Sequence, residues 1–321
     1  MKNEIEIHKG LVIRGSHNII IVRIETEEKG PEELECRIKG KVLKGCENFY
    51  NPLAPGDLVT VERGKNSRGA LILSLEERRN LFSRFNQKGG ASQLLAANVD
   101  LVLCVCTPLS PPFRPRFIDR VLLQADYAGI EACVICNKID LDEQEPDTDE
   151  RLQDFTRAGY KVLRVSAKTG EGIDELRRFT EGKTSVLAGQ SGAGKSSLIN
   201  ALEPGLGVRE GGLNEKYDRG VHTTTMSYMF YMPDGTRLID TPGVRLFIPD
   251  RIKKEEIILH MKEFAPLAGR CSYGMSCSHK HEPGCKIMEA VHAGIIHEDR
   301  YESFLRIRDD IEGNSNDGYR K

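Results

Sequence analysis

Short runs in which apolar and polar residues alternate dominate the first quarter of the chain. These runs are LVIR, NIIIVRI, LECRIKG, DLVTVE and ALIL, and turn-forming stretches such as NPLAPGD separate them. Alternation with a period of two is typical of strands that bury one face. Five or so short strands within residues 1–75 predict an all-β domain, and this number of strands in this length favours a small β-barrel of the OB type.

From about residue 95 the pattern changes to strands that alternate with helices. The apolar runs NVDLVLCVC, EACVIC and YKVLRVS have the length of buried strands, whereas RFIDRVLLQADYAG, DERLQDFTRAG and GIDELRRFT are amphipathic. Such alternation predicts a doubly wound parallel sheet with helices on both faces. We assign this second domain to residues 76–245.

A helical pattern follows, and we assign it to a third domain at residues 246–321. The stretches KKEEIILHMKEF and DRYESFLRIRDDI predict helices, and a cluster of cysteines lies between them. We therefore expect a multidomain α/β protein with a barrel, a doubly wound sheet and a helical C-terminal part.

The composition indicates an ordinary soluble protein. The chain has 321 residues, a formal net charge of −2 and 29% charged residues. No apolar run approaches the ~18 residues of a membrane span, and MKNEIEIHKG lacks the apolar region of a signal peptide. Four of the nine cysteines lie in apolar strand-like runs, where cysteine packs as a small buried hydrophobe. These are Cys104, Cys106, Cys133 and Cys136, and we expect a cytoplasmic protein with reduced thiols.

The segment GQSGAGKSS, residues 189–197, predicts a phosphate-binding loop. It fits G-x-x-x-x-G-K-[ST] and lies between the strand-like TSVLAG and the helical SSLINAL, which is the context that the motif requires. Backbone N–H groups of such a loop surround phosphate oxygens, Lys195 would contact the β- and γ-phosphates, and Ser196 would bind Mg²⁺. The alternative, a glycine-rich turn with an exposed lysine, fits the flanking elements poorly. We expect the nucleotide to contact Gly189, Gln190, Ser191, Gly192, Ala193, Gly194, Lys195, Ser196 and Ser197.

The element that recognises the base precedes this loop in the chain. In NKID, Asp140 can accept from both N1–H and N2–H₂ of guanine, which adenine does not offer. Asn137 would fix the loop, and the stem of Lys138 can lie over the purine. The motif follows the strand EACVIC, so it lies at the carboxyl end of a parallel strand. A second base-side loop, SAK, follows the next strand and consists of Ser166, Ala167 and Lys168.

Two motifs downstream of the phosphate loop complete a GTPase site. In HTTT, Thr224 would complete the coordination of Mg²⁺, with Thr223 as the alternative. In DTPG, Asp240 would bind Mg²⁺ through water, and the N–H of Gly243 would contact the γ-phosphate. Five motifs at strand ends predict a site for GTP or GDP with Mg²⁺.

The order of these motifs along the chain is unusual. GTPases ordinarily begin with the phosphate loop and end with NKxD and SAK, whereas here NKxD and SAK come first. The motif set is therefore circularly permuted.

The permutation, the N-terminal barrel and the cysteine cluster together resemble the circularly permuted ribosome-assembly GTPases of the RsgA (YjeQ) family. The stretches AANVD, NKIDL, GQSGAGKSSLIN, RGVHTTT and DTPGVR carry this resemblance, which covers essentially the whole chain. It implies an OB-type barrel, a permuted GTPase domain and a helical domain that binds zinc. It also implies that the small ribosomal subunit and its rRNA are the partner, that the subunit stimulates GTP hydrolysis, and that the protein acts late in subunit maturation as a monomer.

The cysteine cluster CSYGMSCSHKHEPGC predicts a structural zinc site. Its spacing is C-x5-C-x-H-x5-C, and three thiolates with one imidazole fill a tetrahedral Zn²⁺ site and leave no position for a catalytic water. Reduced thiols that bind no metal are the alternative. His281 could replace His279, although the C-x-H dipeptide of the family favours His279. The spacing between the first two cysteines is one residue longer than is typical of the family. This difference affects the geometry of the loop more than the identity of the ligands. The expected ligands are Cys271, Cys277, His279 and Cys285.

Direct sequence support for RNA binding is weak. Residues 1–75 hold nearly equal numbers of basic and acidic residues, and their only aromatic residues are Phe49 and Tyr50. The segment 63–90 is more basic, but a solvated linker explains this as well as a phosphate-binding patch does. Its basic residues are Arg63, Lys65, Arg68, Arg78, Arg79, Arg84 and Lys88.

The residue that follows DTPG bears on catalysis. Many GTPases have a glutamine there to orient the attacking water, but this chain has Val244, which cannot form that hydrogen bond. His222 is the candidate for this role, with Lys195 and Arg219 offsetting phosphate charge; an exposed switch residue is the alternative interpretation of His222. A nucleotide-gated RNA-binding scaffold without turnover is the competing function, and the intact Lys195, Ser196 and Asp240 disfavour it. An ATPase or nucleotide kinase is inconsistent with Asp140.

Overall fold

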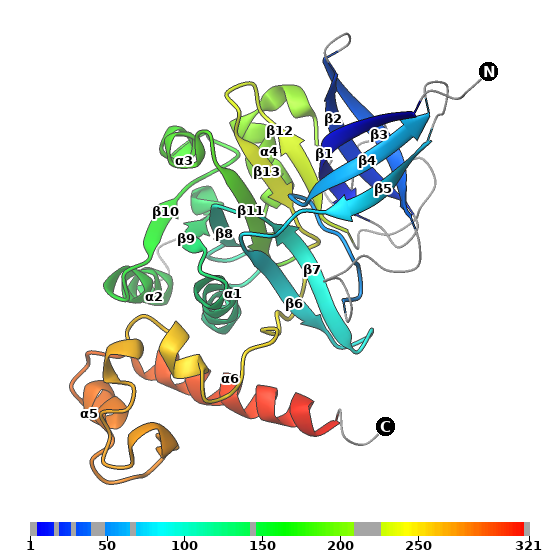
Figure 1. The fold of residues 1–321 in the computed structure, drawn as a ribbon. Helices are drawn as coiled ribbons and strands as arrows, with labels where there is room; N and C mark the ends of the chain where they lie inside the picture. The colour runs from blue at the N-terminus through cyan, green and yellow to red at the C-terminus, as the bar shows by residue number, and fades with distance from the viewer. Residues whose placement is uncertain are drawn as a thin grey trace.

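Three parts follow one another along the chain in a computed structural model of the protein (Figure 1). An N-terminal barrel is followed by a sheet with helices on both faces, and then by a C-terminal part of short helices and turns. The structure describes residues 5–15, 19–26, 30–39, 49–64, 69–141, 146–208 and 226–317.

The N-terminal part is a closed five-stranded barrel, as the alternating pattern predicts. Strand β1 pairs antiparallel with β2 and β4, β2 pairs with β3, β4 pairs with β5, and the parallel pairing of β3 with β5 completes the ring. Every second side chain points inward, so that Val12, Val22, Val61 and Ile72 are buried in the barrel core. The strands are β1 (Ile5–Gly15), β2 (Ile20–Thr26), β3 (Gly30–Ile38), β4 (Leu58–Gly64) and β5 (Gly69–Leu75).

The central part is a doubly wound sheet with the strand order β10-β9-β8-β11-β13-β12. All neighbours are parallel except β12, which runs antiparallel to β13. One face packs against α1 and α2 and the other against α3 and α4, which gives two apolar cores. The strands are β8 (Leu101–Cys106), β9 (Glu131–Cys136), β10 (Lys161–Arg164), β11 (Thr184–Gly189), β12 (Tyr228–Tyr231) and β13 (Arg237–Asp240). The helices are α1 (Pro115–Tyr127), α2 (Pro146–Arg157), α3 (Ile173–Thr180) and α4 (Lys195–Leu202).

The four cysteines of the apolar runs are buried in this part, as expected. Cys104, Cys106 and Cys136 lie in the core under α1, and Cys133 lies in the core on the opposite face. All four are free thiols.

The barrel and the central sheet are joined by strand pairing at one edge. Arg14 of β1 pairs with Tyr228 of β12, so the two sheets form one continuous order of eleven strands. The guanidinium of Arg23 lies 4.0 Å from the ring centroid of Tyr231, a cation–π contact across the same junction.

A β-hairpin that the sequence analysis did not predict lies between the barrel and the central sheet. Strands β6 (Leu81–Asn86) and β7 (Ala91–Ala97) pair only with each other in the described part of the chain, apart from a single bridge between Phe49 and Ser92. The Phe82 ring of β6 stacks on Phe247, which follows the DTPG segment.

The C-terminal part contains the predicted helix at its end and not the one at its start. Residues 253–264 form turns and the short 3₁₀ helix η4 (Ile257–His260), so the helix predicted for KKEEIILHMKEF is wrong. Pro266 in the next turn, η5 (Ala265–Leu267), blocks helix extension, and burial of Met261 and Phe264 in the local core favours the turns. The helices are α5 (Lys286–His292) and α6 (Glu298–Asp317), the latter as predicted from DRYESFLRIRDDI.

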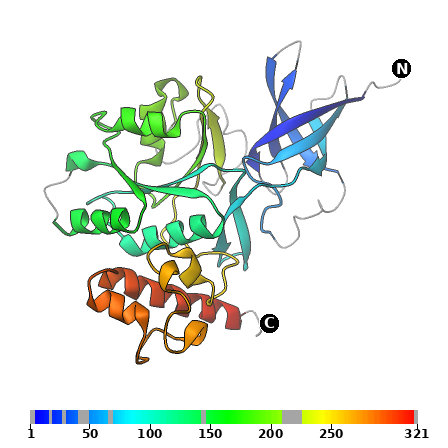
Figure 2. The same ribbon diagram turned by 60° about the vertical axis from the view of Figure 1, so that its left-hand side comes forward.

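Helix α6 lies beside α1 (Figures 1 and 2). A buried arginine joins the two parts. The guanidinium of Arg300 donates to Asp119 of α1 and to Glu263, and both its side chain and that of Asp119 are almost fully buried. Leu123 of α1 belongs to the C-terminal apolar core. Among the described residues, no helix is both long and apolar enough to cross a membrane.

Candidate functional site

The predicted nucleotide-binding motifs lie together at one edge of the central sheet. NKID follows β9, SAK follows β10, the phosphate loop follows β11 and DTPG follows β13. These strands are parallel and in register, with Cys136 opposite both Cys106 and Arg164, and Leu187 opposite Asp240. Because parallel strands end at the same edge, segments that are far apart in the sequence form one site.

Asn137 connects three of these loops. Its Nδ2 donates to the carbonyl oxygen of Ala193 at 3.0 Å, and its Oδ1 accepts from the N–H of Ala167 at 3.1 Å. The side chain is buried, so both bonds are protected from water. Gly194 has a φ of +87°, and a Cβ there would lie 2.3 Å from Nδ2 of Asn137, so glycine is required at this position.

Asp140 and the SAK loop, which the sequence predicts to bind the base, lie together. Oδ1 of Asp140 accepts from the Ser166 hydroxyl at 2.7 Å, and Nζ of Lys168 lies 3.7 Å from Oδ2. The hydrogen bond from Ser166 is the main cause that lowers the pKa of Asp140, and the charge of Lys168 adds to it. The carboxylate is thus held ionised in a fixed orientation, which is the form that accepts two N–H donors.

Lys138 spans the distance between the NKID loop and the phosphate loop. Its Nζ donates to the carbonyl oxygens of Gly192 at 2.8 Å and Ser110 at 2.9 Å. The backbone of Lys138 has a φ of +64°, a conformation that non-glycine residues rarely adopt and that is often found at functional sites. With the ammonium fixed at both carbonyls, the aliphatic stem is held across the site.

The phosphate loop encloses the ammonium of Lys195. Nζ donates to the carbonyl oxygens of Gly189 at 3.2 Å and Gln190 at 3.3 Å, and burial lowers the pKa of this lysine. Gln190 and Ala193 are buried, Ser191 and Gly192 are exposed, and Ser197 lies in the first turn of α4. A cation within a loop of exposed N–H groups is the arrangement that binds phosphate oxygens.

Ser196 and Asp240 provide oxygen atoms suited to Mg²⁺. Oγ of Ser196 lies 3.4 Å from Oδ2 of Asp240, and Oδ1 of Asp240 is buried with no hydrogen-bond partner among the described residues. Burial raises the pKa of Asp240, although the nearby charge of Lys195 opposes this. Hard oxygen donors, one of them an unsatisfied buried carboxylate oxygen, fit a Mg²⁺ site. Thr224, its alternative Thr223 and His222 lie outside the described residues.

The DTPG segment contacts the phosphate loop closely. A Cβ on Gly243 would lie 2.6 Å from Cα of Ser191, so only glycine fits there. The Thr241 hydroxyl donates to the Leu187 carbonyl oxygen at 2.6 Å and fixes the start of the segment. Val244 packs against the apolar core under α1.

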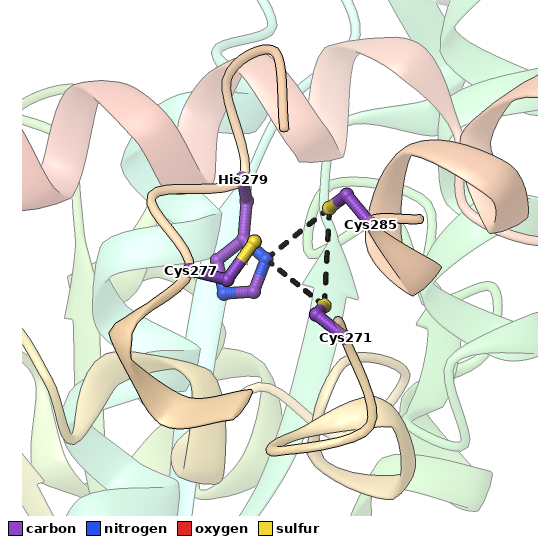
Figure 3. Close-up of side chains that lie close together, drawn as sticks. All are labelled: Cys271, Cys277, His279 and Cys285. Carbon is purple, nitrogen blue, oxygen red and sulfur yellow. Dashed lines mark hydrogen bonds between the residues drawn. The ribbon is translucent and has the colours of Figure 1, made fainter. Parts of the chain in front are cut away.

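The predicted zinc ligands converge at a second site, in the C-terminal part (Figure 3). All four residues are buried, and their ligand atoms lie within 4.8 Å of one another. Sγ of Cys271 lies 3.9 Å from Sγ of Cys285, and Nδ1 of His279 lies 3.6 Å and 3.4 Å from these two sulfur atoms. Zn–S bonds of about 2.3 Å and Zn–N bonds of about 2.0 Å give tetrahedral edges of about 3.8 Å and 3.5 Å, so these three atoms have the spacing of Zn²⁺ ligands, with Cys277 nearby as a fourth. The four residues are Cys271, Cys277, His279 and Cys285.

Backbone contacts hold the zinc-ligand loops in place. The Glu282 carboxylate accepts from the N–H groups of Ser278, Lys280 and His281. The hydrogen bond from the Ser278 side chain, followed by the backbone bonds of Ser278 and His281, holds the pKa of Glu282 well below its usual range. The N–H of Lys286 donates to Sγ of Cys271 at 3.3 Å, as expected for a thiolate ligand. His281 is exposed and outside the cluster. The short 3₁₀ helix η6 (Gly274–Ser276) accommodates the five residues between the first two cysteines.

The chain is similar to known proteins over nearly its whole length. Residues 75–248 match the family model described as RsgA GTPase. The chain is 37% identical over 308 residues to the small ribosomal subunit biogenesis GTPase RsgA of Bacteroides fragilis, covering 95% of this chain and 97% of that protein. The chain belongs to the RsgA GTPase family.

Solved structures related to the RsgA family share the whole architecture. The crystal structure of YjeQ from Thermotoga maritima aligns with a TM-score of 0.71 and 31% identity, over 96% of this chain and 99% of that one. YloQ, a circularly permuted GTPase, aligns with a TM-score of 0.66 and 23% identity over 96% of each chain. This RsgA-family protein is therefore a GTP hydrolase with a circularly permuted GTPase domain, a barrel and a cysteine–histidine cluster suited to zinc.

Two supporting residues of these sites were not found from the sequence. Ser110 contributes a backbone carbonyl oxygen to Lys138, and no side-chain motif marks such a role. Glu282 lies within HKHEPG, where an acidic residue between metal ligands is a signal that could have been used.

Proposed function

We propose that this protein acts in the late maturation of the small ribosomal subunit, and that contact with the subunit accelerates its GTP hydrolysis. The names of the relatives support the subunit as the partner, because they are small ribosomal subunit biogenesis GTPases. The observation that supports nucleotide-dependent action most strongly is the double hydrogen bond of Asn137, which ties the base-side loops to the phosphate loop. We further propose a cytoplasmic monomer that carries one structural Zn²⁺.

The proposed binding roles follow from the contacts of each side chain. The Asp140 carboxylate, oriented by Ser166, accepts from N1–H and N2–H₂ of guanine. The ammonium of Lys195 lies where it can exchange loop carbonyls for β- and γ-phosphate oxygens. Ser196 and Asp240, together with Thr224, hold Mg²⁺, which neutralises phosphate charge when bound.

Hydrolysis needs a group that orients the attacking water. Val244 packs against the core and has no polar atom in its side chain, so it cannot supply that hydrogen bond. We propose that His222 does so when the small ribosomal subunit is bound, and that Lys195 stabilises the charge that develops on the phosphate. Intrinsic turnover is then slow, and stimulated turnover is fast.

The basic segment 63–90 gives no independent evidence that the protein contacts rRNA. Three of its arginines form ion pairs within the protein: Arg63 with Glu32, Arg78 with Asp57 and Arg79 with Asp100. Arg78 is also buried, and its guanidinium contacts both carboxylate oxygens of Asp57. We therefore base the proposed contact with the small subunit and its rRNA on the relatives and not on this segment.

Single-turnover GTP hydrolysis with and without purified small ribosomal subunits tests the proposal. We expect the subunits to accelerate hydrolysis at least about tenfold, since groups supplied by a partner are worth ~10³–10⁵ in other GTPases. Large ribosomal subunits at equal concentration are the control. An unchanged rate would favour a nucleotide-gated scaffold, and subunit pelleting assays with GTP and GDP would then test that function.

A further inference from the structure

Asp250 is a buried carboxylate at the far end of the segment that follows DTPG. It is 2% exposed, and its two oxygens accept hydrogen bonds from the hydroxyls of Ser83 and Ser92, each at 2.7 Å. Its N–H donates to Oε1 of Gln124 in α1 at 2.6 Å. One residue thus binds both strands of the β6–β7 hairpin and the helix that covers the sheet.

The residues just before Asp250 are fixed to the same two elements. The Phe247 ring lies 5.7 Å from the ring of Phe82 in β6 and 6.3 Å from the ring of Phe117 in α1, measured between centroids. The carbonyl oxygen of Ile248 accepts from the N–H of Phe85 at 3.0 Å. Residues 247–250 are therefore anchored by apolar packing and by hydrogen bonds.

The segment between Asp240 and Phe247 lies between two anchors. The Thr241 hydroxyl fixes its start to β11, whereas Gly243, Arg245 and Leu246 are exposed. A short span with both ends fixed has fewer conformations to lose when it is ordered than a longer span with one loose end. The anchor at Asp250 thus keeps the Gly243 backbone near Ser191 at a low entropic cost.

We infer that Asp250 is a positioning residue for the γ-phosphate contact of Gly243, acting through the hydrogen bonds to Ser83, Ser92 and Gln124. The inference rests on the role proposed above for the Gly243 N–H. It assigns the β6–β7 hairpin and α1 a part in distinguishing GTP from GDP, although neither supplies an atom to the phosphates. Loss of these hydrogen bonds weakens the anchor that residues 247–250 form, and thus weakens binding of the triphosphate more than binding of the diphosphate.

A purely structural role for Asp250 makes a different prediction, and Asn51 provides the matched control. Asn51 is also buried, and its side chain makes three hydrogen bonds: to the carbonyl oxygens of Leu53 and Leu94 and from the N–H of Leu94 in β7. Asn51→Ala therefore loosens the same hairpin without touching residues 241–250. It should lower stability and leave nucleotide discrimination unchanged.

Hydrogen–deuterium exchange of the full-length protein with GDP and with a non-hydrolysable GTP analogue tests the inference. In the wild type we expect the amides of residues 243–246 to exchange more slowly with the analogue than with GDP. Asp250→Ala should lose most of that difference. Its affinity for the analogue relative to GDP should fall about fivefold, which is the effect of losing the one hydrogen bond from the Gly243 N–H to the γ-phosphate. Ser83→Ala combined with Ser92→Ala removes the same bonds from the other side and replaces Asp250→Ala if that variant does not fold.

The outcomes separate this inference from the proposed function. If Asp250→Ala or the double serine variant keeps the full wild-type difference, the inference is wrong and the role of Gly243 stands. The inference is also wrong if Asn51→Ala reduces the difference as much as those variants do. A wild-type protein that exchanges equally with both nucleotides would refute the γ-phosphate contact itself, and the inference with it.

Discussion

The hydroxyl of Ser166 donates a 2.7 Å hydrogen bond to Oδ1 of Asp140, which joins the two base-side loops. Asp140→Ala should weaken GTP binding by about 2–4 kcal/mol, because two donors of the base are left unmatched. Ser166→Ala should cost about 1 kcal/mol, since the carboxylate remains but is no longer oriented. Titration with a fluorescent GTP analogue measures both changes, and Glu25→Ala, at an exposed position of the barrel, serves as a comparison. An Asp140→Ala variant that binds GTP as the wild type does would show that NKID is misassigned.

The lowered pKa of Asp140 predicts how nucleotide binding depends on pH. The ionised carboxylate is the form proposed to bind guanine, and a depressed pKa keeps it ionised as the pH falls through the ordinary Asp value of about 3.9. The Ser166 hydrogen bond is the main cause of the depression, so Ser166→Ala should lose affinity at a higher pH than the wild type. Affinity for GDP between about pH 3.5 and 6, with folding monitored by circular dichroism, measures this. Superimposable profiles would contradict the assigned cause.

The zinc cluster predicts a selective loss of the C-terminal fold. Purified protein should contain about one Zn²⁺, and Cys285→Ser should lose it because a hydroxyl is a poor zinc ligand. Residues 271–317 should then exchange rapidly, while GDP affinity stays within about twofold because the nucleotide site lies in a separate core. Cys36→Ser, which changes a buried thiol of the barrel, is the control and should retain zinc. Metal-free wild type with ordered residues 271–285 would refute the site.

Arg300 should be the most sensitive residue of the contact between α1 and α6. Arg300→Met removes the partner of the buried Asp119 carboxylate and of the partly buried Glu263 carboxylate, and we expect a loss of about 3–5 kcal/mol in the free energy of unfolding. Adding Asp119→Asn should recover part of this loss, because a neutral side chain is less costly to bury. Arg306→Met in the same helix breaks an exposed pair with Glu302 and should cost under about 1 kcal/mol. Denaturant unfolding measures all three, and equal losses for Arg300→Met and Arg306→Met would contradict the buried network.

His222→Ala should remove most of the acceleration by small ribosomal subunits and spare GTP binding. We assign this role to His222 because Val244 occupies the position where many GTPases have a glutamine that orients the water. The exposed His281, near the zinc site, supplies the control His281→Ala, which should be stimulated as strongly as the wild type. Single-turnover rates with saturating subunits decide between them. Equal stimulation of His222→Ala and wild type would mean that another group orients the water.

Much of the nucleotide site could be predicted because its motifs are local. The phosphate loop, NKID and SAK each follow a recognisable buried strand, and parallel strands bring such loops to one edge whatever their order in the chain. The zinc ligands lie within fifteen residues of sequence, from Cys271 to Cys285, so their spacing predicted the cluster, and the C-x-H dipeptide of the family favoured His279 over His281.

The features that were missed depend on contacts between distant residues. Asp250 is separated from Ser83 and Ser92 by 167 and 158 positions, and no local pattern links them. The β6–β7 hairpin has mixed polarity on both strands, although the turn residues QKGG were an available signal. The helix predicted for residues 253–264 was wrong because burial of Met261 and Phe264 outweighs helix propensity there.

The pairing of β1 with β12 determines where strain enters the GTPase sheet. The barrel is attached next to β12 and β13, whereas the loops predicted to bind guanine follow β9 and β10 at the opposite edge. A load on the barrel is therefore transmitted first to the strands that flank the γ-phosphate half, and the base-binding loops are the last to move. A partner that binds the barrel therefore acts first on the side of the site that would distinguish GTP from GDP, and only later on the side that would recognise the base.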